Sequence, residues 1–369
     1  MYSQVPHRSE TLSKTGRQVS FIAAVAAVSL AGTMAATLGC GSGTLQATIP
    51  QSSAVPTASA QGPQLGYLWL ESDQTLRPIL GVAGASQIGQ SLVPAGTYVA
   101  AASNAAANVA VLQDSDGNFD LMRLPSGSPA SLSVKLPPAA AIRISPSASS
   151  ALLYTPGTSA GTLITNLLSK PQAQTVKFAG PIVDSAVSDT GTIATEYSQS
   201  SSLALAVTAI SGRSVPLASL GADGGLSFLP NHDDLLFADG ASNSATLVRS
   251  TTSAPSSSLV QTGSLLKSPS ALGVSGSGRW ALVVNTASNS ATQSLVRIDL
   301  NTLTTVSVAC SCKPTEAAVL TDDGAFRVTN VKSGANWIVD ASSATPRTLF
   351  IPALPQAAKT SLVAANITP

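Results

Sequence analysis

The sequence predicts an all-β protein of the β-propeller class. Short apolar runs bounded by Ser, Asp, Asn and Gly recur at a nearly constant spacing, and each recurrence holds four such runs. No segment after residue 40 shows a long helical periodicity of 3.6 residues. Four strands in a unit of about 40–45 residues are typical of a propeller blade. We therefore expect seven four-stranded blades, one of them a composite that joins both ends of the chain.

One hairpin marks each unit: an apolar strand, a polar turn and a second apolar strand. The six hairpins lie at 98–112, 141–154, 184–197, 225–237, 271–284 and 317–330. Their turns begin at Ser103, Ser145, Ser188, Pro230, Ser275 and Thr321. Successive turns are 42, 43, 42, 45 and 46 residues apart, which indicates one repeated structural unit.

Two further strand-like runs complete each unit. In the second unit they lie at 161–168 and 174–179, and in the fifth at 294–300 and 304–310. The sixth unit repeats the pattern at 336–341 and 347–352. These runs are rich in Val, Ile, Leu and Thr, so we expect them to be the third and fourth strands of their blades.

The two ends of the repeat region predict how the ring closes. Runs at 66–72 and 75–82 look like the third and fourth strands of a blade, and a run at 361–367 looks like a first strand. Joined, they make one composite blade that leaves no vulnerable sheet edge. Residues 64–369 number 306, which is about seven units of 44. A sandwich or an unclosed ring is the alternative.

Two hairpin turns carry a family resemblance. Ser145-Pro146-Ser147 and Ser188-Asp189-Thr190-Gly191 resemble the Ser-Pro-Asp-Gly turn of WD-repeat-like and TolB-like propellers of bacterial envelopes. The Trp-Asp dipeptide and the Gly-His pair of true WD repeats are absent. The resemblance implies the propeller architecture and a bacterial envelope protein, without a functional subfamily.

The N-terminus has the character of an export signal. Arg8, Lys14 and Arg17 precede an apolar run of 16 residues at 21–36, which is shorter than the roughly 20 residues that cross a bilayer. The following Thr37-Leu38-Gly39-Cys40 resembles a bacterial lipobox, although Thr37 and Leu38 depart from its usual pattern. The resemblance implies lipidation of Cys40. Cleavage without lipidation and a retained membrane anchor are the alternatives.

These observations divide the chain into three parts. We expect residues 1–39 to be a signal peptide, 40–63 to be a lipidated Cys with a flexible Ser/Thr/Pro tether, and 64–369 to be the propeller. The protein should then be exported and anchored by its N-terminal lipid on the periplasmic or outer-membrane side of the envelope. By resemblance to known lipoproteins, Ser42 favours the outer membrane.

The scarcity of charge excludes one class of partner. Charged residues make up 10% of the 369 residues and the net charge is +1, against about 25% charged residues in an ordinary soluble domain. Nucleic-acid binding needs clustered Lys and Arg, and the basic residues here are dispersed. Aromatic residues are only 4%, so Ala, Val, Leu and Ile should fill the core. Trp69, Trp280 and Trp337 lie in strand runs and should pack between blades, unless one reaches the channel mouth as a ligand platform.

One loop is a candidate ion site. Asp114, Asp116, Asn118 and Asp120 alternate through a short segment, and oxygen side chains in a tight loop suit Ca²⁺. The loop resembles the calcium loops of integrin-type propellers, but its last Asp comes two residues early. The Asp-Gly and Gly-Asn dipeptides also make it a plain hairpin turn. We favour the turn, and we expect no cofactor apart from this calcium alternative.

Other reactive residues are few. His232 is the only histidine after the signal segment and lies in a turn, where we expect it to be solvated. Residues 157–161 match Gly-x-Ser-x-Gly, but the match links two strands and lacks the helix that a nucleophile elbow needs. Cys310 and Cys312 are separated by one residue, and in an oxidising compartment we favour a local disulfide over free thiols or a metal site.

The residues favour a binding protein over an enzyme. We predict a non-enzymatic, monomeric binding or scaffold propeller that engages an envelope protein, a peptide or a glycan through loops at one mouth of the ring. The alternative is a propeller-type hydrolase or lactonase that uses a calcium ion in the channel, and a purely structural surface protein is a third reading. An inner lining of Ala, Ser, Val and Ile argues against an enzyme, whereas converging Asp, Glu, Asn or His argues for one.

Overall fold

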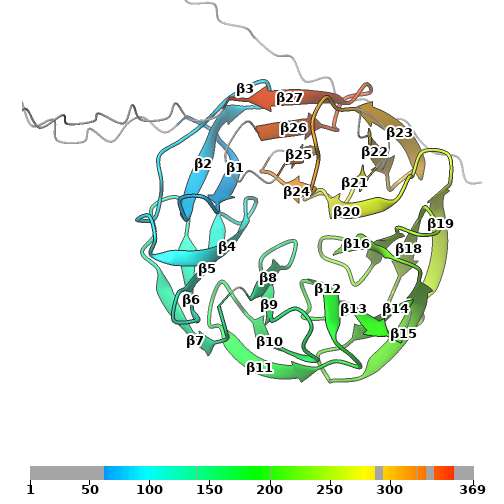
Figure 1. Ribbon diagram of the computed structural model, residues 1–369, viewed down its shortest axis with the longest axis horizontal. Coiled ribbons are helices and arrows are strands. Elements are labelled where there is room, and N and C mark those ends of the chain that lie inside the picture. Colours follow the sequence, from blue (N-terminus) through cyan, green and yellow to red (C-terminus); the bar gives the residue numbers. More distant parts are fainter. Residues whose placement is uncertain are drawn as a thin grey trace, which may run out of the picture. The chain divides into compact units, whose positions relative to one another are not determined.

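The fold is known from a computed structural model. It describes residues 62–352, apart from 139, 201, 287–293, 322 and 330–335. The chain divides into two compact units, Met1–Thr57 and Ala58–Pro369, and the described residues all belong to the second. Their regular elements are all β-strands, so no helix in this part of the chain is suited to crossing a membrane. The strands form seven antiparallel sheets arranged as a ring (Figure 1), which confirms the predicted β-propeller.

Each sheet starts at the centre of the ring and ends at its rim (Figure 1). The inner strands are β1 (Gln64–Leu70), β4 (Tyr98–Asn104), β8 (Ala141–Ile144), β12 (Ile182–Val187), β16 (Asp223–Phe228), β20 (Pro269–Val274) and β24 (Ala318–Val319). The second strands are β2 (Thr75–Val82), β5 (Val109–Asp114), β9 (Ser150–Tyr154), β13 (Ile193–Gln199), β17 (Leu235–Asp239), β21 (Trp280–Asn285) and β25 (Ala325–Arg327).

The outer half of each blade follows the same order. The third strands are β3 (Ala85–Ile88), β6 (Asn118–Arg123), β10 (Ala160–Thr165), β14 (Ser202–Thr208), β18 (Ser244–Arg249), β22 (Ser294–Asp299) and β26 (Asn336–Asp340). Six blades add a fourth strand: β7 (Ala130–Lys135), β11 (Gln172–Lys177), β15 (Ser214–Leu220), β19 (Ser256–Thr262), β23 (Thr304–Ala309) and β27 (Arg347–Ile351). The predicted hairpins and outer strands of the six full units are thus confirmed.

The first blade differs in one respect from its expected role. We expected residues 66–72 to be a third strand, but β1 is the inner strand of a three-stranded sheet, β1-β2-β3. The ring closes where this blade meets the last one, because Thr321 donates to the Leu65 carbonyl and its hydroxyl donates to the Gln64 carbonyl, both at 2.8 Å. Side chains of both blades share one hydrophobic cluster there, including Leu68 and Ile338. The expected closing strand at 361–367 lies outside the described residues.

The core lies between neighbouring blades. Phe119 of one blade packs in a single cluster with Leu153 and Ile164 of the next, and equivalent clusters recur around the ring. The second strands lie inside this layer, and every residue of β9 and β21 is buried. This explains why they read as continuous apolar runs, since both of their faces meet apolar neighbours.

Three of the turns between first and second strands repeat one geometry. In the turns that begin at Ser145, Ser188 and Ser275, the fourth residue donates its N–H to the carbonyl of that Ser, at 2.9 Å for Ala148, 3.1 Å for Gly191 and 2.9 Å for Gly278. That fourth residue has φ of 56°, 84° and 75° in the three turns. Because glycine adopts a positive φ without steric cost, the Gly of the turn motif has a direct physical cause.

Asp189, in one of these turns, links three blades. Its carboxylate accepts the backbone N–H of Ser147 in the preceding blade and of Asn231 in the following blade, both at 2.8 Å. Hydrogen bonds to a charged acceptor are stronger than neutral ones. The same face of the ring carries a second link, in which Asp233 accepts the hydroxyls of Ser188 and Thr190 at 2.8 and 2.6 Å.

We expect Asp189→Ala to destabilise the ring by about 1–3 kcal/mol, because two backbone donors lose a charged acceptor. Urea unfolding measures the change. Asp116→Ala is the matched control, since the Asp116 side chain is exposed in a turn within one blade. A loss for Asp189→Ala no larger than that of the control would contradict the role of Asp189 as an inter-blade link.

Candidate functional site

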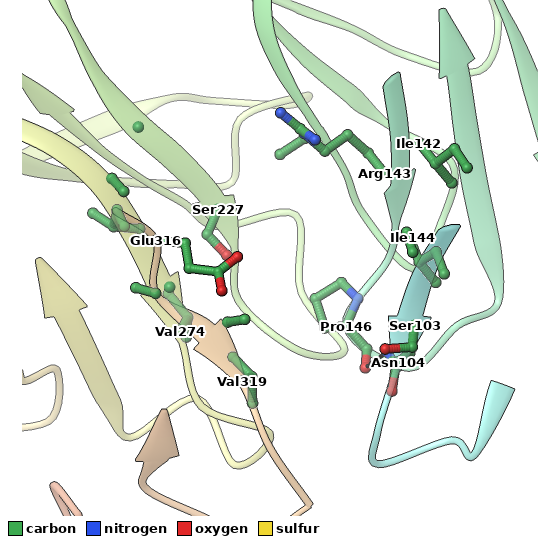
Figure 2. Close-up of a pocket in the computed structure, with 18 of the residues that line it drawn as sticks. Ser103, Asn104, Ile142, Arg143, Ile144, Pro146, Ser227, Val274, Glu316 and Val319 are labelled. Atoms are coloured by element: carbon green, nitrogen blue, oxygen red, sulfur yellow. Dashed lines mark hydrogen bonds between the residues drawn. The ribbon is translucent and has the colours of Figure 1, made fainter. Parts of the chain in front are cut away.

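The inner strands of all seven blades surround a central cavity of about 740 Å³. Its walls are mainly small or aliphatic, since the inner strands contribute many Ala, Ser, Val and Ile residues (Figure 2). Five charged side chains nevertheless line it: Arg143, Asp184, Asp223, Glu316 and Arg327.

Four of these charges form two ion pairs. Arg143 Nη2 lies 2.7 Å from Asp184 Oδ1, and Arg327 Nη2 lies 3.1 Å from Glu316 Oε1. The Arg143 side chain is 44% exposed, so it faces the open cavity. Arg143 and Glu316 extend into the cavity from opposite walls in Figure 2. The walls therefore present separate positive and negative groups to a ligand.

Arg327 keeps unused hydrogen-bonding capacity. Its Nε and Nη1 atoms are buried, and no acceptor among the described residues reaches them. The guanidinium carries five donors in a fixed plane, and Glu316 engages it through Nη2. Burying donors without partners costs stability, so the Arg327–Glu316 pair offers unpaired hydrogen-bond donors at the cavity wall.

A buried carboxyl group stands behind the cavity wall. Glu196 on β13 is 0% exposed, and no donor among the described residues reaches either of its carboxylate oxygens. It is the register partner of Asp184 on β12 and interacts with Asp223 of the next blade. When Glu196 is protonated, its O–H donates to Asp223. We call Asp184, Glu196 and Asp223 the acidic recess.

The environment of the recess keeps Glu196 neutral. Burial, followed by repulsion from Asp223 and Asp184, raises the pKa of Glu196 to about 9. Burial and the neighbouring Asp184 also raise the pKa of Asp223, although the Gly225 N–H donates to Asp223 Oδ1 at 2.9 Å. The raised pKa of Glu196 therefore favours its protonated form at neutral pH.

The tryptophans divide into two structural roles. Trp280 is buried between two guanidinium groups, with Arg279 at 4.3 Å and Arg297 at 4.6 Å from its ring, and Trp337 packs edge-on against Phe350 at 5.3 Å. Trp69 on β1 is half-buried and lines the central cavity. Trp69 also packs against a hydrophobic cluster that the first two blades share, as predicted, so only part of its aromatic surface faces the cavity.

The candidate calcium loop has the hydrogen bonds of a hairpin turn. Asp114 Oδ1 accepts the N–H groups of Asp116 and Asn118 at 2.9 and 2.8 Å, and Oδ2 accepts the Asn118 amide at 2.9 Å. The bond from the Asn118 side chain is the main cause that lowers the pKa of Asp114. Asp120 accepts the Tyr98 hydroxyl at 2.9 Å. Two of the four proposed ligands therefore already have protein donors.

We expect millimolar CaCl₂ to leave the melting temperature unchanged, because Asp114 serves the turn rather than an ion. Differential scanning calorimetry with and without EGTA measures this. The calcium interpretation would replace the turn interpretation if Ca²⁺ raised the melting temperature of the wild type and Asp116→Asn abolished the rise.

The other predicted residues do not meet in one place. Cys310 and Cys312 are joined as a disulfide with Cα atoms 5.1 Å apart, while export to an oxidising compartment stays a prediction. The N–H of His232 donates to the Leu229 carbonyl at 3.4 Å in the turn between β16 and β17. The Gly-x-Ser-x-Gly match spans the turn after β9 and the first two residues of β10. Cys40 and the signal segment lie outside the described residues.

Comparison with protein-family models and with curated proteins finds no match for this sequence. Solved structures with a similar fold include a protein of unknown function from Desulfotomaculum acetoxidans, at 13% identity and a TM-score of 0.56, covering 80% of this chain and 96% of that chain. An oligogalacturonate lyase in complex with manganese has 10% identity and a TM-score of 0.50, covering 78% and 85% of the two chains. At such identities the likeness shows the fold alone. The protein is thus a seven-bladed β-propeller with a central cavity.

Sequence reasoning missed the acidic recess and the two ion pairs. A usable signal was present, because Arg143 and Asp184 interrupt inner strands that otherwise carry few charges. In a chain with only 10% charged residues, a charge inside an inner strand is informative. The meeting of Glu196 with Asp223 had no sequence signal, since the two residues belong to different blades.

Proposed function

We propose that this chain is a non-enzymatic, extracytoplasmic binding or scaffold protein that engages a protein, peptide or glycan through one mouth of the propeller. The cavity is the observation that supports this role. Its small side chains leave about 740 Å³ open, and its walls combine ion pairs with the aromatic surface of Trp69. An apolar pocket with a few convergent polar groups is the usual form of a ligand site. We propose that the protein acts as a monomer.

A capture experiment with a blocked cavity tests this role. The lipidated protein serves as bait in solubilised envelope membranes, next to Ser227→Trp and Ser257→Trp. Ser227 lines the cavity, whereas Ser257 is exposed on β19 at the rim of the same blade. We expect the wild type and Ser257→Trp to retain the same partner and Ser227→Trp to lose it at least tenfold. Equal capture by all three proteins, or capture of nothing, would overturn the proposed role.

The anchor is a separate part of the proposal. We propose that Cys40 carries a lipid that holds the protein on the periplasmic or outer-membrane side of the envelope. We expect Cys40→Ser to move the protein from the membrane fraction to the soluble fraction and to abolish labelling by an alkyne fatty acid. Cys310→Ser is the matched control and should stay labelled. Labelling of Cys40→Ser at the wild-type level would contradict the lipid anchor.

The alternative, a calcium-using hydrolase or lactonase, has one observation in its favour. Asp184 and Asp223 converge on the cavity, as such an enzyme requires. A screen of lactone and ester substrates with CaCl₂ tests it, with Asp223→Asn as the inactive control. If the wild type turns over a substrate in the presence of calcium and Asp223→Asn does not, the enzyme interpretation replaces the binding role.

A further inference from the structure

The acidic recess places the buried carboxyl group of Glu196 next to Asp223, a carboxyl group that lines the cavity. Glu196 is fully buried without a donor to either oxygen, and its interaction partner in the next blade is Asp223, which lines the cavity. Repulsion between ionised carboxylates disfavours a second negative charge beside Asp223. Either a proton on Glu196 or a bound cation relieves this repulsion.

The charge of the recess defines the charge of its ligand. Arg143 neutralises Asp184 at 2.7 Å, so the recess keeps one negative charge, on Asp223, while Glu196 is protonated. It keeps two negative charges once Glu196 is ionised. Repulsion from Asp239 also raises the pKa of Glu196. Asp239 Oδ1, however, already accepts the N–H groups of Gly221, Ala222 and Ala241. The charged and titratable groups that act on the recess are Arg143 (β8), Tyr154 (β9), Asp184 (β12), Asp223 (β16) and Asp239 (β17).

The number of oxygens favours an organic cation. A Ca²⁺ ion takes six to eight oxygen ligands, more than the free oxygens of three carboxyl groups supply when Arg143 and Gly225 already occupy two of them. A lysine ammonium carries one charge and three donors without an acceptor, and so suits the two carboxyl groups that Arg143 does not neutralise, Asp223 and Glu196. The small side chains of the cavity leave room for its four-carbon stem.

We propose that the acidic recess binds the ammonium group of a lysine side chain of the partner, and that Glu196 releases its proton to solvent as the ammonium binds. The exchange balances, because the carboxyl group loses one proton and the ammonium supplies one positive charge in its place. This inference rests on the proposed binding role and specifies the chemistry of the partner. Asp223 is the first contact, since it lines the cavity, and Glu196 completes the site from behind.

Calorimetry with two matched peptides tests the proposal. Acetyl-Gly-Lys-Gly-amide and acetyl-Gly-Gln-Gly-amide are titrated into the whole chain in detergent at pH 7, in phosphate and in Tris. Because these buffers differ in ionisation enthalpy, the difference in heat counts the protons released. We expect the lysine peptide to bind at least tenfold more tightly than the glutamine peptide and to release about one proton for each peptide bound.

Two variants test whether binding of the lysine peptide depends on the acidic recess itself rather than on the cavity in general. Glu196→Gln keeps the shape of the protonated carboxyl group, so we expect it to bind the lysine peptide about tenfold more weakly and to release no proton. Asp223→Asn should lose the preference for lysine over glutamine. Equal affinity for the two peptides, no binding of the lysine peptide at millimolar concentration, or unchanged proton release in Glu196→Gln would each overturn the proposal.

Two further arms distinguish failure of this site from failure of the binding role. If both peptides bind equally and Ser227→Trp loses both, the cavity is a binding site and the ammonium recess is wrong. If the captured partner depends on Ser227 but not on Asp223, the binding role stands and the recess is again wrong. In a third titration, CaCl₂ is added alone. Release of the same proton at a lower concentration of CaCl₂ than of the lysine peptide would also overturn the choice of an organic cation.

Discussion

The Glu196→Gln variant should be more stable than the wild type at pH 8, by about 2–4 kcal/mol. The folded protein holds Glu196 protonated, because its pKa is raised from 4.5 to about 9. The unfolded chain loses that proton near the ordinary value, so the unfolded state binds fewer protons between these two pH values. Stability from this group is therefore fully present below about pH 4.5 and is lost as the pH rises towards 9.

The expected slope is about 1.4 kcal/mol per pH unit for one proton. The amide of the variant does not ionise, and its N–H donates to Asp223 as the protonated carboxyl does. Urea unfolding of both proteins at pH 5, 6, 7 and 8 measures the two slopes. We expect the curves to lie close together at pH 5 and to separate as the pH rises. Asp116→Asn in an exposed turn should follow the wild type, and parallel curves for wild type and Glu196→Gln would contradict the buried neutral carboxyl group.

Gly225→Val should destabilise the protein by about 3 kcal/mol or more, since it combines backbone strain with a steric clash. Gly225 lies in β16 with φ of 89°, a conformation that β-branched residues rarely adopt. A Cβ atom there would lie 2.8 Å from the backbone nitrogen of Leu272 in the next inner strand. The neighbouring backbone cannot move aside, because β20 is paired along its length with β21.

Substitutions at two other glycines distinguish backbone strain from steric clash as causes of the loss of stability. Gly157→Val has a φ of 82° with no atom within 4 Å of the added Cβ, so it should cost about 1 kcal/mol through backbone strain alone. Gly276→Val has neither strain nor a close neighbour and should be nearly neutral. Thermal unfolding orders the three variants. A loss for Gly225→Val equal to that of Gly157→Val would show that the two inner strands are not in close contact.

Local patterns predicted most of the fold for identifiable reasons. The turn at Ser188–Gly191 needs a residue that tolerates positive φ, and the run at 280–284 is apolar throughout because both faces of β21 are buried. Turn geometry and strand burial of this kind depend on a few neighbouring residues, so the sequence shows them directly. The spacing of the turns then predicts the number of blades. The position of β1 could not be predicted in this way. Strand character does not say whether a run lies first or third in its sheet, and packing against the last blade decides it.

The sequence by itself determined the class of the protein: a charge-poor, all-β ring of seven repeated blades with an export-like N-terminus. Periodicity and turn chemistry suffice for this, because each blade is specified by its own residues. Only the tertiary structure decided where chemistry is concentrated. Glu196 and Asp223 meet because two blades pack side by side, and Arg143 reaches Asp184 across another blade boundary. Groups that are ordinary in their own strands become a recess with a shifted pKa when the ring removes them from water.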